Sequence, residues 1–181
     1  MKFIIEHLDK ELHEWSLIEY RHISKIVNGN VIFTNVKNNL SLNGDVKKES
    51  VSELGFENIC VLDSDVEQEL VTEDKFDYYV FGGILGDDPP QKRTEKLIKK
   101  FKGKVHTRNL GNKQMSTDTA VLVTKKILDG GKLSDINFKD GIEIDVREGE
   151  SVMLPYRYVI ENNEPVISDE LLLYLKKKED F

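Results

Sequence analysis

Short apolar runs alternate with segments of helical periodicity over the first 131 residues of the chain. Apolar runs of about four to eight residues bounded by polar ones are typical of buried strands. Strands that alternate with helices predict an α/β fold with a mainly parallel sheet flanked by helices. The predicted strands are residues 2–8, 31–36, 59–62 and 78–81 with a further run ending near 107, and the predicted helices are residues 12–27, 48–54, 89–102 and 116–128.

The pattern changes after Gly131. Residues 142–146 alternate strictly between apolar and acidic positions, as a half-exposed strand should. Residues 136–138 and 151–160 also indicate short strands, and residues 169–178 indicate a C-terminal helix. The sequence therefore predicts two parts, a core over residues 1–131 and a β extension with a helix over residues 132–181 that packs on the core.

Two polar loops each follow a predicted strand and precede a predicted helix. The first, residues 82–90, holds three glycines in five positions, and the second spans residues 107–116. In open α/β sheets such loops lie at the carboxyl ends of strands, where these folds bind ligands. Glycine lets the backbone approach a bound molecule closely. The two loops are therefore the predicted ligand site.

The helix after each loop carries its own start signals. Asp88 can cap the first helix, Pro89 suits its first position and Gln91 can complete a capping box, while Gly103 can end it. The second helix begins among the hydroxyls of residues 116–119. Its broad apolar face predicts packing on both sides. The connection over residues 67–77 is polar with some helical character.

Neither loop fits a phosphate cradle. A P-loop ends in Gly-Lys-Ser/Thr, and the dinucleotide fingerprint is Gly-x-Gly-x-x-Gly. The run Gly-Gly-Ile-Leu-Gly at residues 82–86 gives neither, and Asp87 and Asp88 would repel a pyrophosphate. A ligand with a cationic or neutral polar group fits better.

The motifs of these loops resemble one family. The run Phe-Gly-Gly-Ile-Leu-Gly-Asp-Asp-Pro-Pro at residues 81–90, followed by Arg-x-Leu-Gly-x-x-Gln-Met-Ser-Thr-Asp-Thr-Ala-Val at residues 108–121, is similar to the SPOUT-class methyltransferases. Glu6-His7-Leu8 and residues 14–20 resemble the archaeal and fungal branch that includes the protein-arginine methyltransferase acting on a small-subunit ribosomal protein. The resemblance covers most of the chain.

The resemblance implies a trefoil knot near the C-terminal side of the core, whose loops hold S-adenosylmethionine and release S-adenosylhomocysteine. RNA-methylating members commonly carry Asn where Asp118 stands here, which sets this chain apart from them. The cofactor-binding residues that the resemblance implies are Gly82, Gly83, Leu85, Gly86, Asp87, Arg108, Leu110, Gly111, Gln114, Met115, Ser116, Thr117 and Thr119.

Three carboxylates are candidates for acceptor chemistry. A guanidinium stays protonated near neutral pH, so it must be oriented and must lose a proton as it attacks, and buried carboxylates can do both. Glu6 and Asp63 are predicted at comparable strand ends, as is the glycine loop, whereas Glu19 lies within an apolar helix face. Glu19 either bonds a histidine or an arginine as a structural residue or faces the acceptor pocket. Asp87, Asp88 or Asp118 are alternatives that would face the cofactor.

Charge favours a protein acceptor. The formal net charge is −7, and residues 140–150 hold five carboxylates against one arginine. An acidic surface suits a basic ribosomal protein, whereas RNA binding needs a basic face. Basic residues do gather over residues 92–104, so an RNA methyltransferase acting on rRNA or tRNA stays an alternative. A second alternative is a module that binds the cofactor without turnover. A third is an α/β domain that binds a different small molecule.

The remaining features narrow the class of protein. A single cysteine, Cys60 in an apolar run, excludes an internal disulfide and indicates a buried thiol. The four histidines show no metal-ligand spacing, so no metal is expected. No apolar run reaches the roughly 18 residues of a membrane helix, and the N-terminus does not resemble a signal peptide, which predicts a cytoplasmic protein. The sequence leaves open whether it is a monomer or a homodimer.

Overall fold

The computed structural model describes residues 1–38, 40–83 and 93–177. Its main sheet has the strand order β3-β2-β1-β5-β4-β6, and every pairing in it is parallel. This confirms the mainly parallel sheet. The strands are β1 (Lys2–His7), β2 (Val31–Thr34), β3 (Asp45–Val46), β4 (Ile59–Leu62), β5 (Tyr78–Gly83) and β6 (His106–Arg108).

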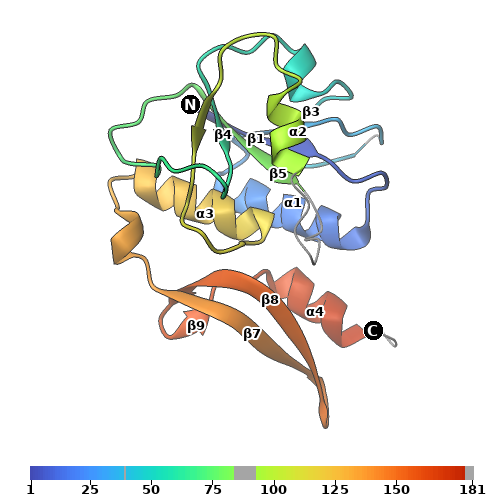
Figure 1. Ribbon diagram of the computed structural model, residues 1–181. Coiled ribbons are helices and arrows are strands. Elements are labelled where there is room, and N and C mark those ends of the chain that lie inside the picture. Colours follow the sequence, from blue (N-terminus) through green and yellow to red (C-terminus); the bar gives the residue numbers. More distant parts are fainter. Residues whose placement is uncertain (39, 84–92, 178–181) are drawn as a thin grey trace.

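Helices cover both faces of this sheet (Figure 1). Helices α1 (Glu14–Ile26) and α3 (Thr117–Leu128) lie on one face, while α2 (Arg93–Ile98) and the short 3₁₀ turn η1 (Val51–Glu53) pack on the other. The alternation of strand residues explains this division, because successive side chains point to opposite faces. Fully buried Ile5 faces α1, whereas its neighbour Ile4 faces η1 and α2.

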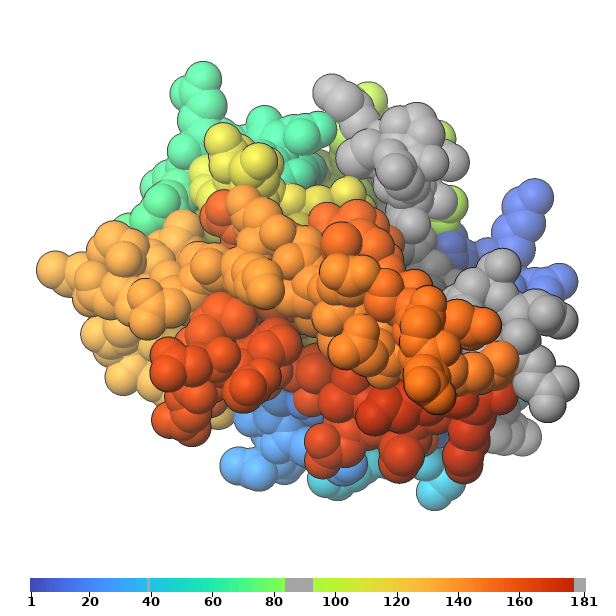
Figure 2. Space-filling view, turned by 90° about the horizontal axis from the view of Figure 1, so that it is seen from below, coloured from blue at the N-terminus to red at the C-terminus, as the bar shows by residue number. Residues whose placement is uncertain are grey.

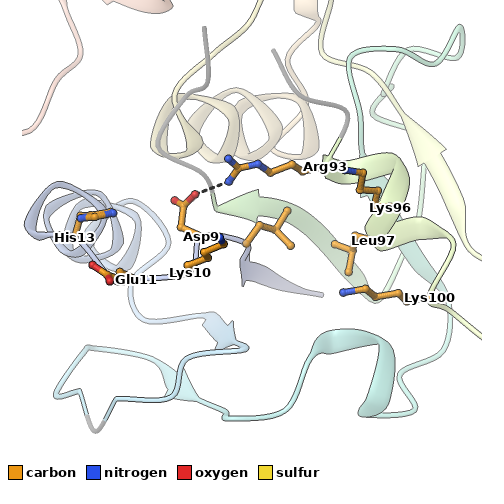
Figure 3. Close-up of a pocket in the computed structure, with 9 residues that line it drawn as sticks. Asp9, Lys10, Glu11, His13, Arg93, Lys96, Leu97 and Lys100 are labelled. Atoms are coloured by element: carbon orange, nitrogen blue, oxygen red, sulfur yellow. Dashed lines mark hydrogen bonds and ion pairs between the residues drawn. The ribbon is translucent and has the colours of Figure 1, made fainter. Parts of the chain in front are cut away.

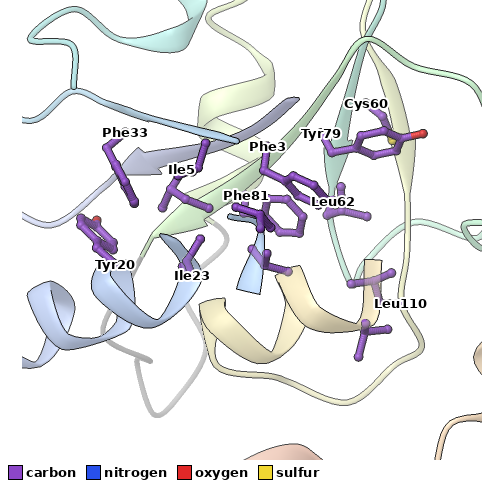
Figure 4. Packing of buried hydrophobic residues seen from close by; sticks show 14 of the residues in the cluster. Phe3, Ile5, Tyr20, Ile23, Phe33, Cys60, Leu62, Tyr79, Phe81 and Leu110 are labelled. Carbon is purple, nitrogen blue, oxygen red and sulfur yellow. The ribbon is translucent and has the colours of Figure 1, made fainter. Parts of the chain in front are cut away.

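The larger core lies between the sheet and the α1–α3 pair (Figure 4). Phe3 and Phe81 stack with ring centroids 6.2 Å apart, and Tyr20 of α1 stacks on Phe33 at 4.9 Å. Burial of each such side chain contributes roughly 1.5–3 kcal/mol. Cys60 is buried here, and burial raises the pKa of its thiol to about 12.

The C-terminal part adds a further layer below α1 and α3 (Figures 1 and 2). Strands β7 (Phe138–Arg147), β8 (Glu150–Glu161) and β9 (Glu164–Pro165) form an antiparallel sheet, followed by α4 (Asp169–Lys177). Ile18 of α1 packs among Ile142, Leu154 and Leu175 of this layer. Helix α1 is therefore buried on both sides, and α3 likewise contacts both β5 and β8.

Several predicted elements differ from the structure. Residues 67–77 contain no helix, because their backbone pairs with the loop after β6 through Leu70 and Asn109. The helix predicted over residues 48–54 is only the turn η1, and α2 ends at Ile98 rather than near Gly103. The start signals at Asp88, Pro89 and Gln91 lie outside the described residues.

The predicted strands of the extension also differ. The three short strands are in fact two long ones joined as a hairpin. Gly141, with φ of 72°, lies at a register shift in β7. The apolar pattern is interrupted at this irregularity, which is why the sequence predicts two separate strands where the structure has β7. No helix within the described ranges is long and apolar enough to cross a membrane.

Candidate active site

The carboxyl ends of four strands meet at one edge of the sheet. Glu6 and His7 of β1 pair with Gly82 and Gly83 of β5, and Leu62 of β4 pairs with Arg108 of β6. The predicted ligand loops and Asp63 therefore start from neighbouring strands, as expected. Leu85, Gly86 and Asp87 lie outside the described residues.

Gly82 and Gly83 belong to β5 rather than to the loop after it. A Cβ on Gly83 would lie 2.7 Å from the Tyr20 hydroxyl and 2.9 Å from Ile5, so only glycine fits this contact with α1. The Tyr20 hydroxyl in turn lies 2.8 Å from Nδ1 of buried His7. Burial lowers the pKa of His7. The strand end is thus fixed against α1.

The loop over residues 109–116 is held from two sides. The backbone N–H of Asn109 donates to Gln68 O at 2.8 Å, and its side-chain oxygen accepts from the Gly111 N–H at 2.8 Å. Gly111 has φ of 93°, a conformation that favours glycine. On the other side, the Arg157 N–H of β8 donates to Gln114 O at 2.8 Å. The extension therefore braces this loop directly, next to Leu110 and Met115.

Arg108 points toward the segment that precedes β5. Its guanidinium donates to both carboxylate oxygens of Asp74, at 2.8 and 2.6 Å, and lies 5.2 Å from the centre of the Phe76 ring. The hydrogen bond to Asp74 raises the pKa of Arg108. This predicted cofactor residue thus joins β6 to the segment over residues 66–77.

Glu6 is buried and has hydrogen-bond donors on both oxygens. The Thr34 hydroxyl and the Val51 N–H donate to Oε2 at 2.6 and 3.0 Å, and the Ser50 hydroxyl donates to Oε1 at 2.6 Å. These contacts tie β1 to β2 and to the start of η1. Asp63 is half-buried, and one of its carboxylate oxygens accepts from the Asp65 N–H at 3.0 Å.

Glu19 lies in a different environment, between α1 and α3. It is buried, and its Oε1 accepts a hydrogen bond from the Trp15 indole at 3.1 Å. Burial, and next the charge of Asp118, raise the pKa of Glu19 well above its ordinary value, against the opposing bonds from Trp15 and Thr117. His22 bonds Asp118, with Nδ1 and Oδ2 2.7 Å apart. The expected histidine partner is therefore present, but it bonds Asp118 rather than Glu19.

Residues around this pair of carboxylates come from three elements. Asp118 Oδ1 accepts from the Thr119 N–H at 2.9 Å, and the Ser116 hydroxyl donates to Thr119 Oγ1 at 2.8 Å. Tyr158 of β8 is buried, and burial followed by the charges of Asp118 and Glu19 raises its pKa. The start of α3, which follows the second ligand loop, is thus adjacent to two buried carboxylates.

The sequence alone does not bring Asp118, His22 and Tyr158 together. It does hold one signal, because Trp15, Glu19 and His22 recur at helical spacing on one face of α1. Their partner Asp118 is 96 residues from His22. No group of three or more side chains suited to a metal occurs among the residues that the structure describes.

Comparison with known proteins identifies the family. A family model described as "Protein arginine N-methyltransferase SFM1-like" matches residues 2–180. The chain belongs to this SFM1-like family. The protein arginine N-methyltransferase SFM1 of Saccharomyces cerevisiae is 34% identical over 204 residues, covering 98% of this chain and 95% of the yeast protein.

Solved structures agree with this membership. The crystal structure of yeast SFM1 complexed with SAM has a TM-score of 0.88 and 32% identity, over 97% of this chain and 90% of that one. A dual-specific Trm10 of Thermococcus kodakaraensis has a TM-score of 0.60 at 16% identity, over 75% of this chain and 96% of its own, which shows a shared fold alone. The SPOUT resemblance is confirmed, while the knot itself stays a prediction.

Proposed function

We propose that this SFM1-like chain transfers a methyl group from S-adenosylmethionine to an arginine of a small-subunit ribosomal protein. The observation that carries the proposal is the match to the arginine methyltransferase SFM1 over nearly the whole chain. Yeast SFM1 was crystallised with SAM and with SAH. The negative surface charge of the chain supports a basic ribosomal protein as the substrate.

The residues of the site suit such a cofactor. S-adenosylmethionine supplies an activated methyl group on a cationic sulfonium. Gly111 allows close approach of the backbone, and the hydroxyls of Ser116, Thr117 and Thr119 lie where the second loop joins α3. Two carboxylates, Glu19 and Asp118, lie beside this point. The site is therefore suited to a ligand with positive charge.

Of the three candidate carboxylates, Glu19 has the contacts that acceptor chemistry needs. Burial and the charge of Asp118 raise the pKa of Glu19, so its carboxyl group holds a proton more strongly than an exposed one does. An arginine side chain placed beside Glu19 and Asp118 would replace that proton as the balancing cation, so Glu19 would ionise as the acceptor binds. Its carboxylate can then orient the guanidinium and take the proton released on methyl transfer. Glu6 has donors on both oxygens already.

The exposed side of the extension is acidic. Glu143, Asp145, Glu148 and Glu150 are exposed on the β7–β8 hairpin, which lies across the outer face of the molecule (Figure 2). Acidic side chains attract a basic partner and increase its rate of association. Because ribosomal proteins are basic, this charge supports the proposed class of substrate.

The test is incubation with methyl-labelled S-adenosylmethionine and ribosomes from a strain that lacks the protein, followed by separate protease and nuclease digestion. The expected result is label that protease releases and that hydrolysis yields as methylarginine, located on a small-subunit protein. Label released by nuclease would replace the proposal with RNA methylation. Labelled methylarginine on a non-ribosomal protein would keep the reaction and overturn the substrate.

A further inference from the structure

A pocket lies at the carboxyl end of β1, where the loop that leads into α1 faces α2. It has a volume of about 570 Å³ and is formed by the loop between β1 and α1 together with one side of α2 (Figure 3). Helix α2 covers the face of the sheet opposite to α1 and α3. Neither Glu19 nor Asp118 lines the pocket, although the charge of its Asp9 acts on Glu19.

Positively charged side chains line this pocket on both of its sides, the β1–α1 loop and α2. Arg93, Lys96 and Lys100 line it from α2 and the turn that follows, and Lys10 lines it from the opposite loop. Arg93 donates to Asp9 at 2.5 Å. The three lysines form no ion pair with any residue that the structure describes. Ammonium groups that gather around one concave surface favour an anionic ligand.

This charge is opposite to that of the chain as a whole. The net charge is −7, yet four cations and two carboxylates line the pocket among the residues that the structure describes, and the Arg93–Asp9 pair leaves three lysines beside Glu11. A basic protein segment would be repelled here. The pocket therefore does not serve the acceptor arginine or its basic surroundings.

We propose that this pocket binds backbone phosphates of a single-stranded segment of RNA. Residues 93–100 extend over about 10 Å at the rise of a helix, which is longer than one phosphate group. Lys96 and Lys100, together with Lys10 of the opposite loop, can therefore contact successive phosphates of a linear polyanion. The pocket also has room for parts of a nucleotide beyond the phosphate.

Other side chains of the pocket suit a nucleotide. Leu8 and Leu97 give it an apolar part, and the exposed ring of His13 offers a planar surface. Unstacked bases bind such surfaces by stacking, largely without regard to sequence. The choice of RNA over another polyanion rests on the proposed function, because a ribosomal substrate is presented beside RNA.

The test measures binding of a fluorescent single-stranded RNA of about twelve nucleotides to the full chain by anisotropy at several salt concentrations. Two double variants are compared, K96Q/K100Q in the pocket and K176Q/K177Q on α4, which remove the same charge. We expect the first to weaken binding about tenfold or more and to reduce the slope of log K against log salt by about 1.4. The second should bind nearly as the wild type does.

Three outcomes would overturn the proposal. They are absence of binding to the wild type, equal weakening by both double variants, and displacement of the RNA by millimolar inorganic phosphate at constant ionic strength, which would indicate a site for a small free anion. Binding is measured without cofactor or substrate protein. Methylarginine formation by the wild type on RNA-free substrate is assayed in parallel, so failure of RNA binding stays distinguishable from failure of the proposed function.

Discussion

Two buried glutamates on opposite sides of the sheet have very different hydrogen-bond partners and neighbouring charges. Glu6, at the end of β1, accepts hydrogen bonds from Thr34, Ser50 and the Val51 N–H. Glu19, on α1, accepts a hydrogen bond from Trp15 and lies beside the carboxylate of Asp118. Both are at most 6% exposed.

The comparison teaches that burial alone does not mark a functional carboxylate. Donors on both oxygens satisfy the buried carboxylate of Glu6 and make it a junction between β1, β2 and η1. Glu19 instead has a raised pKa, caused first by burial and then by Asp118. A carboxylate that is poorly compensated in the free protein is the better candidate to bind a cation, because the ligand supplies the missing charge.

The largest expected effect is loss of stability in Glu6→Ala. The substitution leaves two hydroxyls and the Val51 N–H without their acceptor, so we expect the free energy of unfolding to fall by about 3–5 kcal/mol. Chemical denaturation measures this. Glu57→Ala, which removes an exposed carboxylate, should change stability by less than about 0.5 kcal/mol. A stable but inactive Glu6→Ala would reverse the roles assigned to the two glutamates.

The next effect is loss of turnover in Glu19→Gln. Removal of a group that orients the acceptor and takes its proton should lower kcat about 100-fold, or about 2.7 kcal/mol in activation free energy. Steady-state transfer of labelled methyl groups measures it, with binding of the cofactor measured separately by calorimetry. Glu14→Gln, an exposed position on the same helix, is the matched control. Wild-type turnover in Glu19→Gln would remove Glu19 from the site.

The same variant should alter the dependence of stability on pH. Because the pKa of Glu19 is raised on folding, the folded chain holds a proton that the unfolded chain has lost. The wild type therefore loses stability as pH rises from the ordinary glutamate range through the folded-state pKa, by up to about 1.4 kcal/mol for each pH unit. Glu19→Gln lacks this loss. Its stability relative to the wild type should grow from pH 4 toward neutral pH, and a constant difference would contradict the raised pKa.

Much of the fold could be predicted from local pattern. The apolar run over residues 59–62 predicts β4 with its observed bounds, and helical periodicity locates α1 and α3. Strand order could not be predicted, because β5 pairs with β1 across about 75 residues of chain and no local signal records that pairing. The helical character predicted for residues 67–77 was wrong for a related reason, because the backbone partners of this segment lie in the loop after β6.

The site was predictable only in part. Loops at strand ends follow from the alternation of strands and helices, and the glycines mark the first of these loops in the sequence. Glu19 stands out as an acid within an apolar helix face, but its environment depends on Asp118, which comes from α3, and on Tyr158, which comes from the extension. Such contacts are set by the packing of layers rather than by spacing along the chain.

The smallest expected effect concerns a buried hydroxyl group, which is neutral, unlike the two carboxylates. Thr124 of α3 is fully buried, and no partner for its hydroxyl lies within hydrogen-bond distance among the described residues. Valine has nearly the same shape without the hydroxyl, so Thr124→Val should raise the free energy of unfolding by about 1 kcal/mol or less. Denaturant melts measure the change, with Thr34→Val, which removes a donor to Glu6, as the contrasting substitution. If both substitutions destabilised the chain equally, the number of hydrogen-bond partners would not explain which buried polar groups this fold tolerates.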